Sequence, residues 1–144
     1  MKIKFIFSFI IFLFSCNTKI DSRSLNSVKL LHNKKIDCKN KKLLFLPTNF
    51  CGACSQESIE LIKKYFTNKK NVLIIYNDET TATLELKKQL LSAQFISFPS
   101  DSLSKYGLNF AKARFINISN EKVICSYELK YDFEESIKNC FAEK

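Results

Sequence analysis

The stretch Cys51 to Cys54 (CGAC) lies between an apolar run that ends at Leu46 and a segment, 55–66, whose apolar residues recur at helical spacing. It is therefore predicted to lie where a buried strand gives way to a helix. Free backbone N–H groups and the helix dipole lower the pKa of a thiol in the first helical turn. Two cysteines at this spacing can also close a small disulfide ring. The pattern predicts thiol–disulfide exchange, in which one sulfur attacks and the other resolves the mixed disulfide.

Two other kinds of cysteine site have the same spacing. A C-x-x-C pair is half of many zinc sites, and it can also be a plain structural disulfide. The strand before the motif and the helix after it favour the redox interpretation. Gly52 is one of only two glycines in the chain, and a glycine suits a turn where backbone segments approach closely.

The N-terminus has the pattern of a secretory signal. Lys2 and Lys4 precede an almost wholly apolar run over residues 5–14, too short to span a bilayer as a permanent helix. The run ends at Leu13 to Cys16 (LFSC), which resembles the lipobox of bacterial lipoproteins. The resemblance implies a signal peptide over residues 1–15, lipid on Cys16, and attachment to a membrane of the bacterial cell envelope. Ordinary secretion with cleavage elsewhere is the alternative.

Residues 16–35 are mostly polar and lack sustained periodicity, so they predict a lipidated tether with at most a short turn around Leu25 to Leu31. His32, the sole histidine, falls in this tether, where a solvated side chain is a simpler interpretation than a catalytic or metal-binding role. The folded part is predicted as one domain over residues 36–144, long enough for a sizeable core.

The positive charge of the chain does not point to nucleic acid. The formal net charge is +9, but the lysines are scattered and form no stripe interleaved with exposed aromatic residues. A solvated surface explains them, so no nucleic-acid partner is predicted. Weak attraction to anionic lipid headgroups stays open.

Hydrophobic patterning predicts an alternation of strands and helices. Strands are predicted at 43–46, 72–76, 95–98, 113–118 and 122–129, and helical segments at 55–66, 80–92, 101–106 and 132–141. The last two strands form a hairpin, and the first two are parallel because a helix connects them in a right-handed crossover. The predicted fold class is α/β: a mixed central sheet with helices on both faces.

This order of elements and the cysteine motif together resemble the thioredoxin-like superfamily over about residues 41–141. The segment entering the motif is similar to that of the TlpA- and ResA-type thiol–disulfide oxidoreductases of bacterial envelopes. The resemblance implies a three-layer sandwich in which Cys51 is the exposed nucleophile and Cys54 the buried resolving thiol. It also implies envelope protein substrates with thiols or disulfides, with no cofactor and no metal. Phe50, Gly52 and Ala53 would flank the substrate groove, with Phe50 at the place of the usual tryptophan and Ala53 at that of the usual proline.

Two positions differ from the pattern of this family. A cis-proline normally precedes the first hairpin strand and faces the cysteines, and the alignment puts Ala113 there. A trans peptide is expected at Ala113, because a cis bond at a residue other than proline costs about 2.5–4 kcal/mol. The buried carboxylate often found on the first strand is here Phe45. An alternative function therefore stays open: a non-catalytic lipoprotein of this fold whose cysteine motif is a structural disulfide or a thiolate metal site.

Three further cysteines, Cys38, Cys125 and Cys140, lie outside the motif. In an oxidising envelope the simplest outcome is one pair and one free thiol. Cys140 in the closing helix could pair with either of the other two, and the sequence cannot choose between them. A zinc site built from the motif and two of these cysteines is the metal alternative.

Overall fold

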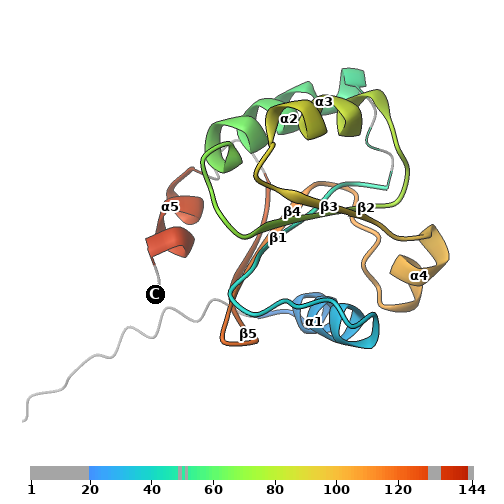
Figure 1. The fold of residues 1–144 in the computed structure, drawn as a ribbon, viewed down its shortest axis with the longest axis vertical. Coiled ribbons are helices and arrows are strands. Elements are labelled where there is room, and N and C mark those ends of the chain that lie inside the picture. The colour runs from blue at the N-terminus through green and yellow to red at the C-terminus, as the bar shows by residue number, and fades with distance from the viewer. Residues whose placement is uncertain (1–19, 49, 51, 130–133, 143–144) are drawn as a thin grey trace, which may run out of the picture.

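The computed structural model of the chain describes residues 20–48, 50, 52–129 and 134–142. Helices and strands alternate along this part of the chain, as Figure 1 shows. Their bounds are α1 (Ser22–Asn33), β1 (Lys42–Phe45), α2 (Gly52–Phe66), β2 (Val72–Tyr76), α3 (Thr81–Gln89), β3 (Gln94–Ser97), α4 (Ser100–Lys105), β4 (Arg114–Ser119), β5 (Lys122–Glu128) and α5 (Glu134–Ala142). The predicted α/β class is confirmed.

The five strands form one mixed sheet in the order β3-β2-β1-β4-β5. β1 is parallel to β2, and β2 is parallel to β3, as expected for strands joined by helices. β4 is antiparallel to both β1 and β5. The predicted hairpin is confirmed, and its turn residues Asn120 and Glu121 both have positive φ, of 48° and 65°. Two such residues form the type I′ turn that suits the twist of a two-residue hairpin.

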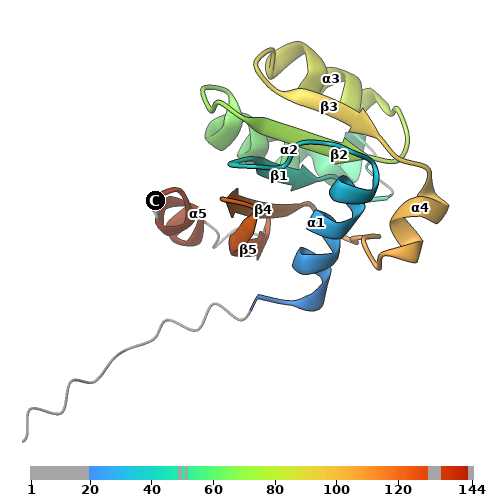
Figure 2. The ribbon, with the colours of Figure 1, turned by 60° about the horizontal axis from the view of Figure 1, so that its bottom comes forward.

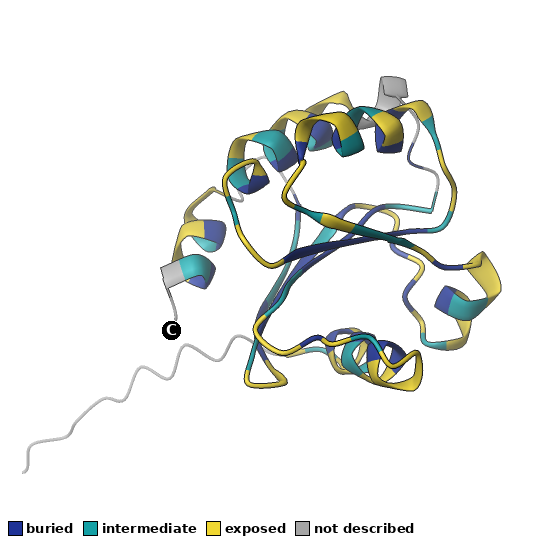
Figure 3. Cartoon of the chain, in the orientation of Figure 1, coloured by how far each residue is buried: buried dark blue, intermediate teal, exposed yellow. Residues whose placement is uncertain are grey.

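Helices cover both faces of the sheet, in three layers (Figures 1 and 2). On one face α2, α3 and α5 bury their apolar side chains against alternate strand residues such as Leu44, Ile74 and Phe115. On the other face α1 and α4 pack on the intervening residues, such as Leu43 and Ile75. Because both faces are covered, the inner strands are buried along almost their whole length (Figure 3), which explains their continuous apolar runs.

Helix α1 differs from the sequence-based expectation of a polar tether. Residues 22–33 form a helix in which Leu30 and Leu31 are fully buried against the sheet. Ser24 and Ser27 are buried as well, and the hydroxyl of Ser27 donates a hydrogen bond of 2.6 Å to the carbonyl of Ser24. These serines complete the buried face of the helix, which has fewer apolar residues than that of α2. The part of the chain that packs on the sheet therefore begins with α1, ahead of the boundary predicted at Ile36.

Candidate functional site

The backbone around the cysteine motif has the predicted strand-to-helix arrangement. β1 ends at Phe45, and α2 begins at Gly52 and continues for 15 residues. Ala53 and Cys54 therefore lie in the first turn of this helix, where the unpaired N–H groups and the dipole favour a thiolate. Cys51 lies outside the described residues, and the side chains of α2 are described from Gln56 onward. The roles assigned to Cys51 and Cys54 remain predictions.

The loop that leads to the motif is tied to the sheet on two sides. The backbone N–H of Leu46 donates to the carbonyl of Ile75 at 2.8 Å, which extends the pairing of β1 with β2. The N–H of Thr48 donates to the carbonyl of Phe110 at 3.3 Å. Phe50, which we predicted to flank a substrate groove, is instead buried in the core on the α2 face. Its side chain therefore leaves almost no surface for a substrate.

Ala113 lies beside this loop. Phe45 pairs with Arg114 across β1 and β4, so the next residues along the same register, Leu46 and Ala113, come opposite one another. The carbonyl of Ala113 accepts a hydrogen bond of 2.8 Å from the N–H of Leu129. The described residues contain no cis peptide bond, as expected at Ala113. Ala113 is fully buried in the same core cluster as Leu46 and Phe50. Like Phe50, it therefore has almost no exposed surface that a substrate could contact.

Phe45 is the residue that the resemblance puts at the place of a carboxylate. Its side chain is buried on the α1 face, and its ring meets that of Phe110 edge-on, with the ring centroids 5.4 Å apart. Two guanidinium groups lie over Phe110, that of Arg23 at 5.8 Å and that of Arg114 at 5.5 Å from the ring centroid. At the end of β1 the structure thus has an aromatic pair flanked by arginines, and the Phe45 side chain offers no group for proton transfer.

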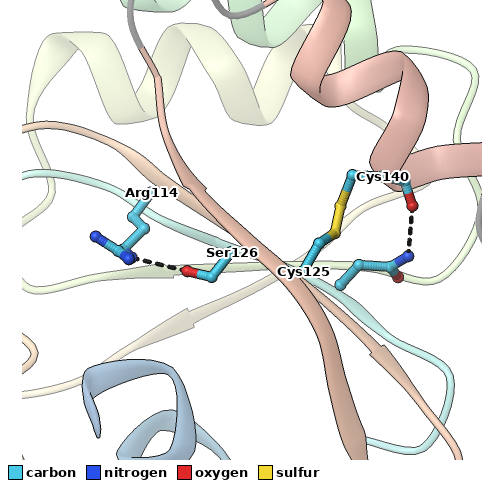
Figure 4. The surroundings of a disulfide bond; sticks show 5 residues. Arg114, Cys125, Ser126 and Cys140 are labelled. Atoms are coloured by element: carbon cyan, nitrogen blue, oxygen red, sulfur yellow. Dashed lines mark hydrogen bonds between the residues drawn. A yellow bond between two sulfur atoms is a disulfide. The ribbon is translucent and has the colours of Figure 1, made fainter. Parts of the chain in front are cut away.

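Arg114 is the centre of a polar network that the sequence analysis missed. Its Nε donates to the hydroxyl of Ser126 at 2.9 Å (Figure 4), and its Nη2 donates to the carboxylate of Asp21 at 2.5 Å. Asp21 also caps α1 by accepting hydrogen bonds from the N–H and the hydroxyl of Ser24. An aspartate followed by serines is a helix-start signal, so the cap could be predicted from the sequence. The ion pair of Asp21 with Arg114 in β4 could not.

The pKa of Asp21 reflects these contacts. Partial burial by itself raises the pKa, but the two hydrogen bonds from Ser24 and the charges of Arg114 and Arg23 outweigh it. The pKa of the carboxyl is therefore below its ordinary value. Asp21 is therefore ionised at neutral pH, and its carboxylate oxygens accept hydrogen bonds from Ser24 and pair with Arg114.

The structure selects one of the cysteine pairings that the sequence left open. Cys125 in β5 and Cys140 in α5 form a disulfide, with their Cα atoms 5.9 Å apart (Figure 4). The side-chain amide of Asn117 donates to the carbonyl of Cys140 at 3.0 Å and fixes the same end of α5. Cys38 is free and buried, and its burial together with the charges of Glu121 and Asp37 raises its pKa.

This pairing removes the donors that a four-cysteine zinc site would need. Cys125 and Cys140 are bonded to each other, and Cys38 lies in the core cluster on the face of the sheet opposite α2. His32 is exposed on α1. Among the residues that the structure describes, no group of three histidine, cysteine, aspartate or glutamate side chains is placed to hold a metal ion.

The predicted signal peptide, 1–15, and the predicted lipidation residue, Cys16, lie outside the described residues. Within the described part of the chain, no helix has both the length and the apolar character needed to cross a bilayer. Comparisons of the chain with protein-family models, with curated proteins and with solved structures found no match.

Proposed function

We propose that this protein is a thioredoxin-like thiol–disulfide oxidoreductase of the bacterial cell envelope, held to a membrane by lipid on Cys16. The observation that carries the proposal is the start of α2 at Gly52, directly after the loop from β1. Gly52, Ala53 and Cys54, the last three residues of the C-x-x-C sequence, thus lie in the first turn of a long helix, a setting that lowers thiol pKa values and would support exchange.

In the proposed reaction, the thiolate of Cys51 attacks one sulfur of a disulfide in an envelope protein. A mixed disulfide forms and the other substrate sulfur leaves as a thiolate. Cys54 then attacks the sulfur of Cys51, which releases the second substrate thiol and closes the Cys51–Cys54 disulfide. Two electrons pass from the enzyme to the substrate, and the reverse sequence oxidises a dithiol without any cofactor.

Topology gives the proposal further support. The strand order β2-β1-β4-β5 combines a parallel pair with an antiparallel hairpin, and α2 and α5 lie on one face, as in the thioredoxin-like layout that the sequence resembles. The loop before β4, with Ala113, flanks the loop before the motif. A buried disulfide elsewhere in the fold, Cys125–Cys140, suits a protein of an oxidising compartment.

A non-catalytic role for the same fold is the second candidate, and Phe45 and Ala113 favour it. The first replaces the proton-transferring acid of the family with a buried ring, and the second removes the proline that shapes the docking edge. In this case Cys51 and Cys54 would form a permanent disulfide or would hold a metal with thiolates alone.

The reduction potential of the Cys51–Cys54 pair distinguishes these functions. We expect a value between about −120 and −270 mV, the range of catalytic pairs, whereas a structural disulfide lies below about −300 mV. The potential is measured by equilibration with glutathione or dithiothreitol, followed by alkylation and mass mapping of the motif peptide, so that Cys125–Cys140 is read separately. The second readout is the trapped intermediate with a disulfide-bonded protein substrate. The Cys54→Ser variant should accumulate a mixed disulfide with it, and the Cys51→Ser variant should not.

A further inference from the structure

A basic groove lies between the C-terminal end of α2 and helix α5. It has a volume of about 450 Å³ and is open to solvent. The side chains of Lys64, Tyr65, Lys69, Ile137, Lys138 and Phe141 line it. We call this the α2–α5 groove. Its apolar floor and lysine rim differ from the mixed charges on the exposed face of α2, where Glu60 and Lys63 pair with each other.

The lysines of the α2–α5 groove are only partly neutralised. Glu134 pairs with both Lys64, at 3.1 Å, and Lys138, at 3.4 Å. Lys69 and the adjacent Lys42 have no carboxylate within ion-pair distance among the described residues. Among the described residues, three lysines of the groove and the neighbouring Lys42 thus face one glutamate, which is an excess of positive charge.

Lys42 and Lys69 converge on one aromatic ring. The Nζ atom of Lys69 lies 4.5 Å from the centroid of the Phe141 ring, and that of Lys42 lies 5.9 Å from it. Burial and the nearby charge of Lys69 lower the pKa of Lys42. The two ammonium groups repel each other, and an anion placed between them would relieve that repulsion.

We infer that the α2–α5 groove binds the headgroup of an anionic phospholipid, with its phosphate between Lys42 and Lys69. Lysine stems that lie along an aromatic ring are suited to the boundary of a bilayer, where the ammonium groups meet phosphates and the ring meets the upper acyl region. An open groove of this volume fits a headgroup, and it lacks the exposed strand edge that an extended acidic peptide would pair with.

The groove lies away from the cysteine motif in the fold (Figures 1 and 2). α5 and α1 lie on opposite faces of the sheet, and the Asp21–Arg114 ion pair holds the start of α1 at the strand end next to the motif loop. The groove is thus a contact separate from the lipid on Cys16. The cysteine motif is at the other end of α2, roughly 20 Å away at 1.5 Å per helical residue. Binding through the groove would therefore turn the motif away from the membrane. The inference adds to the lipid anchor in the proposed function and is independent of the thiol chemistry.

A chain that begins at Asn17 tests the groove without lipid. It lacks Cys16, it keeps every described residue, and all members of the two core clusters lie at Val28 or later. Co-sedimentation is measured with vesicles of phosphatidylcholine alone and of phosphatidylcholine with phosphatidylglycerol in equal parts. We expect binding only to the anionic vesicles. One lysine near an anionic surface strengthens binding about fivefold, so Lys42→Gln/Lys69→Gln should weaken it about 25-fold and Lys69→Gln alone about fivefold.

The matched control is Lys88→Gln/Lys105→Gln, which removes the same charge from exposed positions on α3 and α4. We expect this variant to bind within about twofold of the parent, since its lysines are away from the groove. Equal losses in both double variants would overturn the proposal, because binding would then follow net charge alone. Binding to soluble polyglutamate that depends on Lys42 and Lys69, without binding to the anionic vesicles, would also overturn it and would indicate an acidic protein partner.

Discussion

The carboxylate of Asp21 lies 2.5 Å from the guanidinium of Arg114, although 93 residues separate them in the chain. Asp21 begins α1, and Arg114 begins β4 directly after Ala113. The ion pair therefore joins the first helix to the strand end that flanks the loop of the cysteine motif. A segment that the sequence describes as a linker is thus fastened to the part of the sheet on which the proposed chemistry depends.

Removing the carboxylate should loosen this connection. We expect Asp21→Asn to lower the free energy of unfolding by up to about 1 kcal/mol, because it removes the partly buried ion pair with Arg114 while asparagine can still cap the helix. Urea denaturation followed by circular dichroism measures the change. Glu57→Gln removes an exposed carboxylate of α2 and serves as the control, with no expected change. If the two variants are equally stable, Asp21 does not hold α1 to the sheet.

The stabilisation by Asp21 should depend on pH. Its folded-state pKa is below the ordinary value of 3.8, so the folded state favours the ionised carboxyl. The stabilisation is therefore fully present above that ordinary value and is lost as the pH falls through the lower folded-state pKa. We expect the difference in unfolding free energy between the wild type and Asp21→Asn to shrink on acidification across this window. A difference that stays constant there would contradict the assigned pKa direction.

The Cys125–Cys140 disulfide should be a structural bond. It closes a loop with a sequence separation of 15, and a loop of this length predicts a contribution of about 3 kcal/mol to the free energy of unfolding. We expect Cys125→Ala/Cys140→Ala to lose about this amount in denaturant titrations, and the reduced wild type to match it. Both residues are almost fully buried, so reductants should reach the bond only when α5 opens. Rapid reduction in the folded state would contradict this structural role.

Cys38 should resist alkylation in the folded protein. Its side chain is 2% exposed, and burial with the charges of Glu121 and Asp37 raises its pKa, so little thiolate forms at neutral pH. Brief treatment of the reduced protein with iodoacetamide, followed by peptide mapping, should label Cys51 first and leave Cys38 unlabelled until urea is added. Early labelling of Cys38 would contradict the packing of α1, and preferential labelling of Cys54 would contradict the roles given to the motif.

Much of the sheet could be predicted from the sequence, because its covered inner strands are continuous apolar runs. The predicted range 72–76 is that of β2, and the short link at Asn120 predicts the observed hairpin. Helix α1 could not be predicted, since its buried face combines Leu30 and Leu31 with two serines. The hydroxyls of these serines donate hydrogen bonds within the same segment, to the carboxylate of Asp21 and to the carbonyl of Ser24. The apolar residues of α1 are sparser than those of α2, although they gather on one side of the helix as strongly.

The site was predicted less completely than the sheet. The strand-to-helix context of the motif follows from the order of the elements. The burial of Phe50 and the contacts of Arg114 depend on residues that are distant in the chain, so the local pattern holds no sign of them. The partner of Cys140 was open for the same reason, because each pairing was compatible with the cysteine spacing alone.

Ala113 offers a direct test of the alignment on which the proposed function rests. Its methyl group is fully buried in the cluster that holds Leu46 and Phe50, the two apolar residues of the loop before the motif. Ala113→Val should cost about 1–3 kcal/mol of stability through overpacking, and the displaced loop should also change the alkylation rate of Cys51 and the potential of the pair. Ala82→Val is the matched control, since Ala82 in α3 is equally buried in the same cluster. We expect it to lose similar stability and to leave both thiol measurements unchanged. If the two variants affect the thiols alike, Ala113 is not coupled to the motif, and the thioredoxin-like alignment loses its support at this residue.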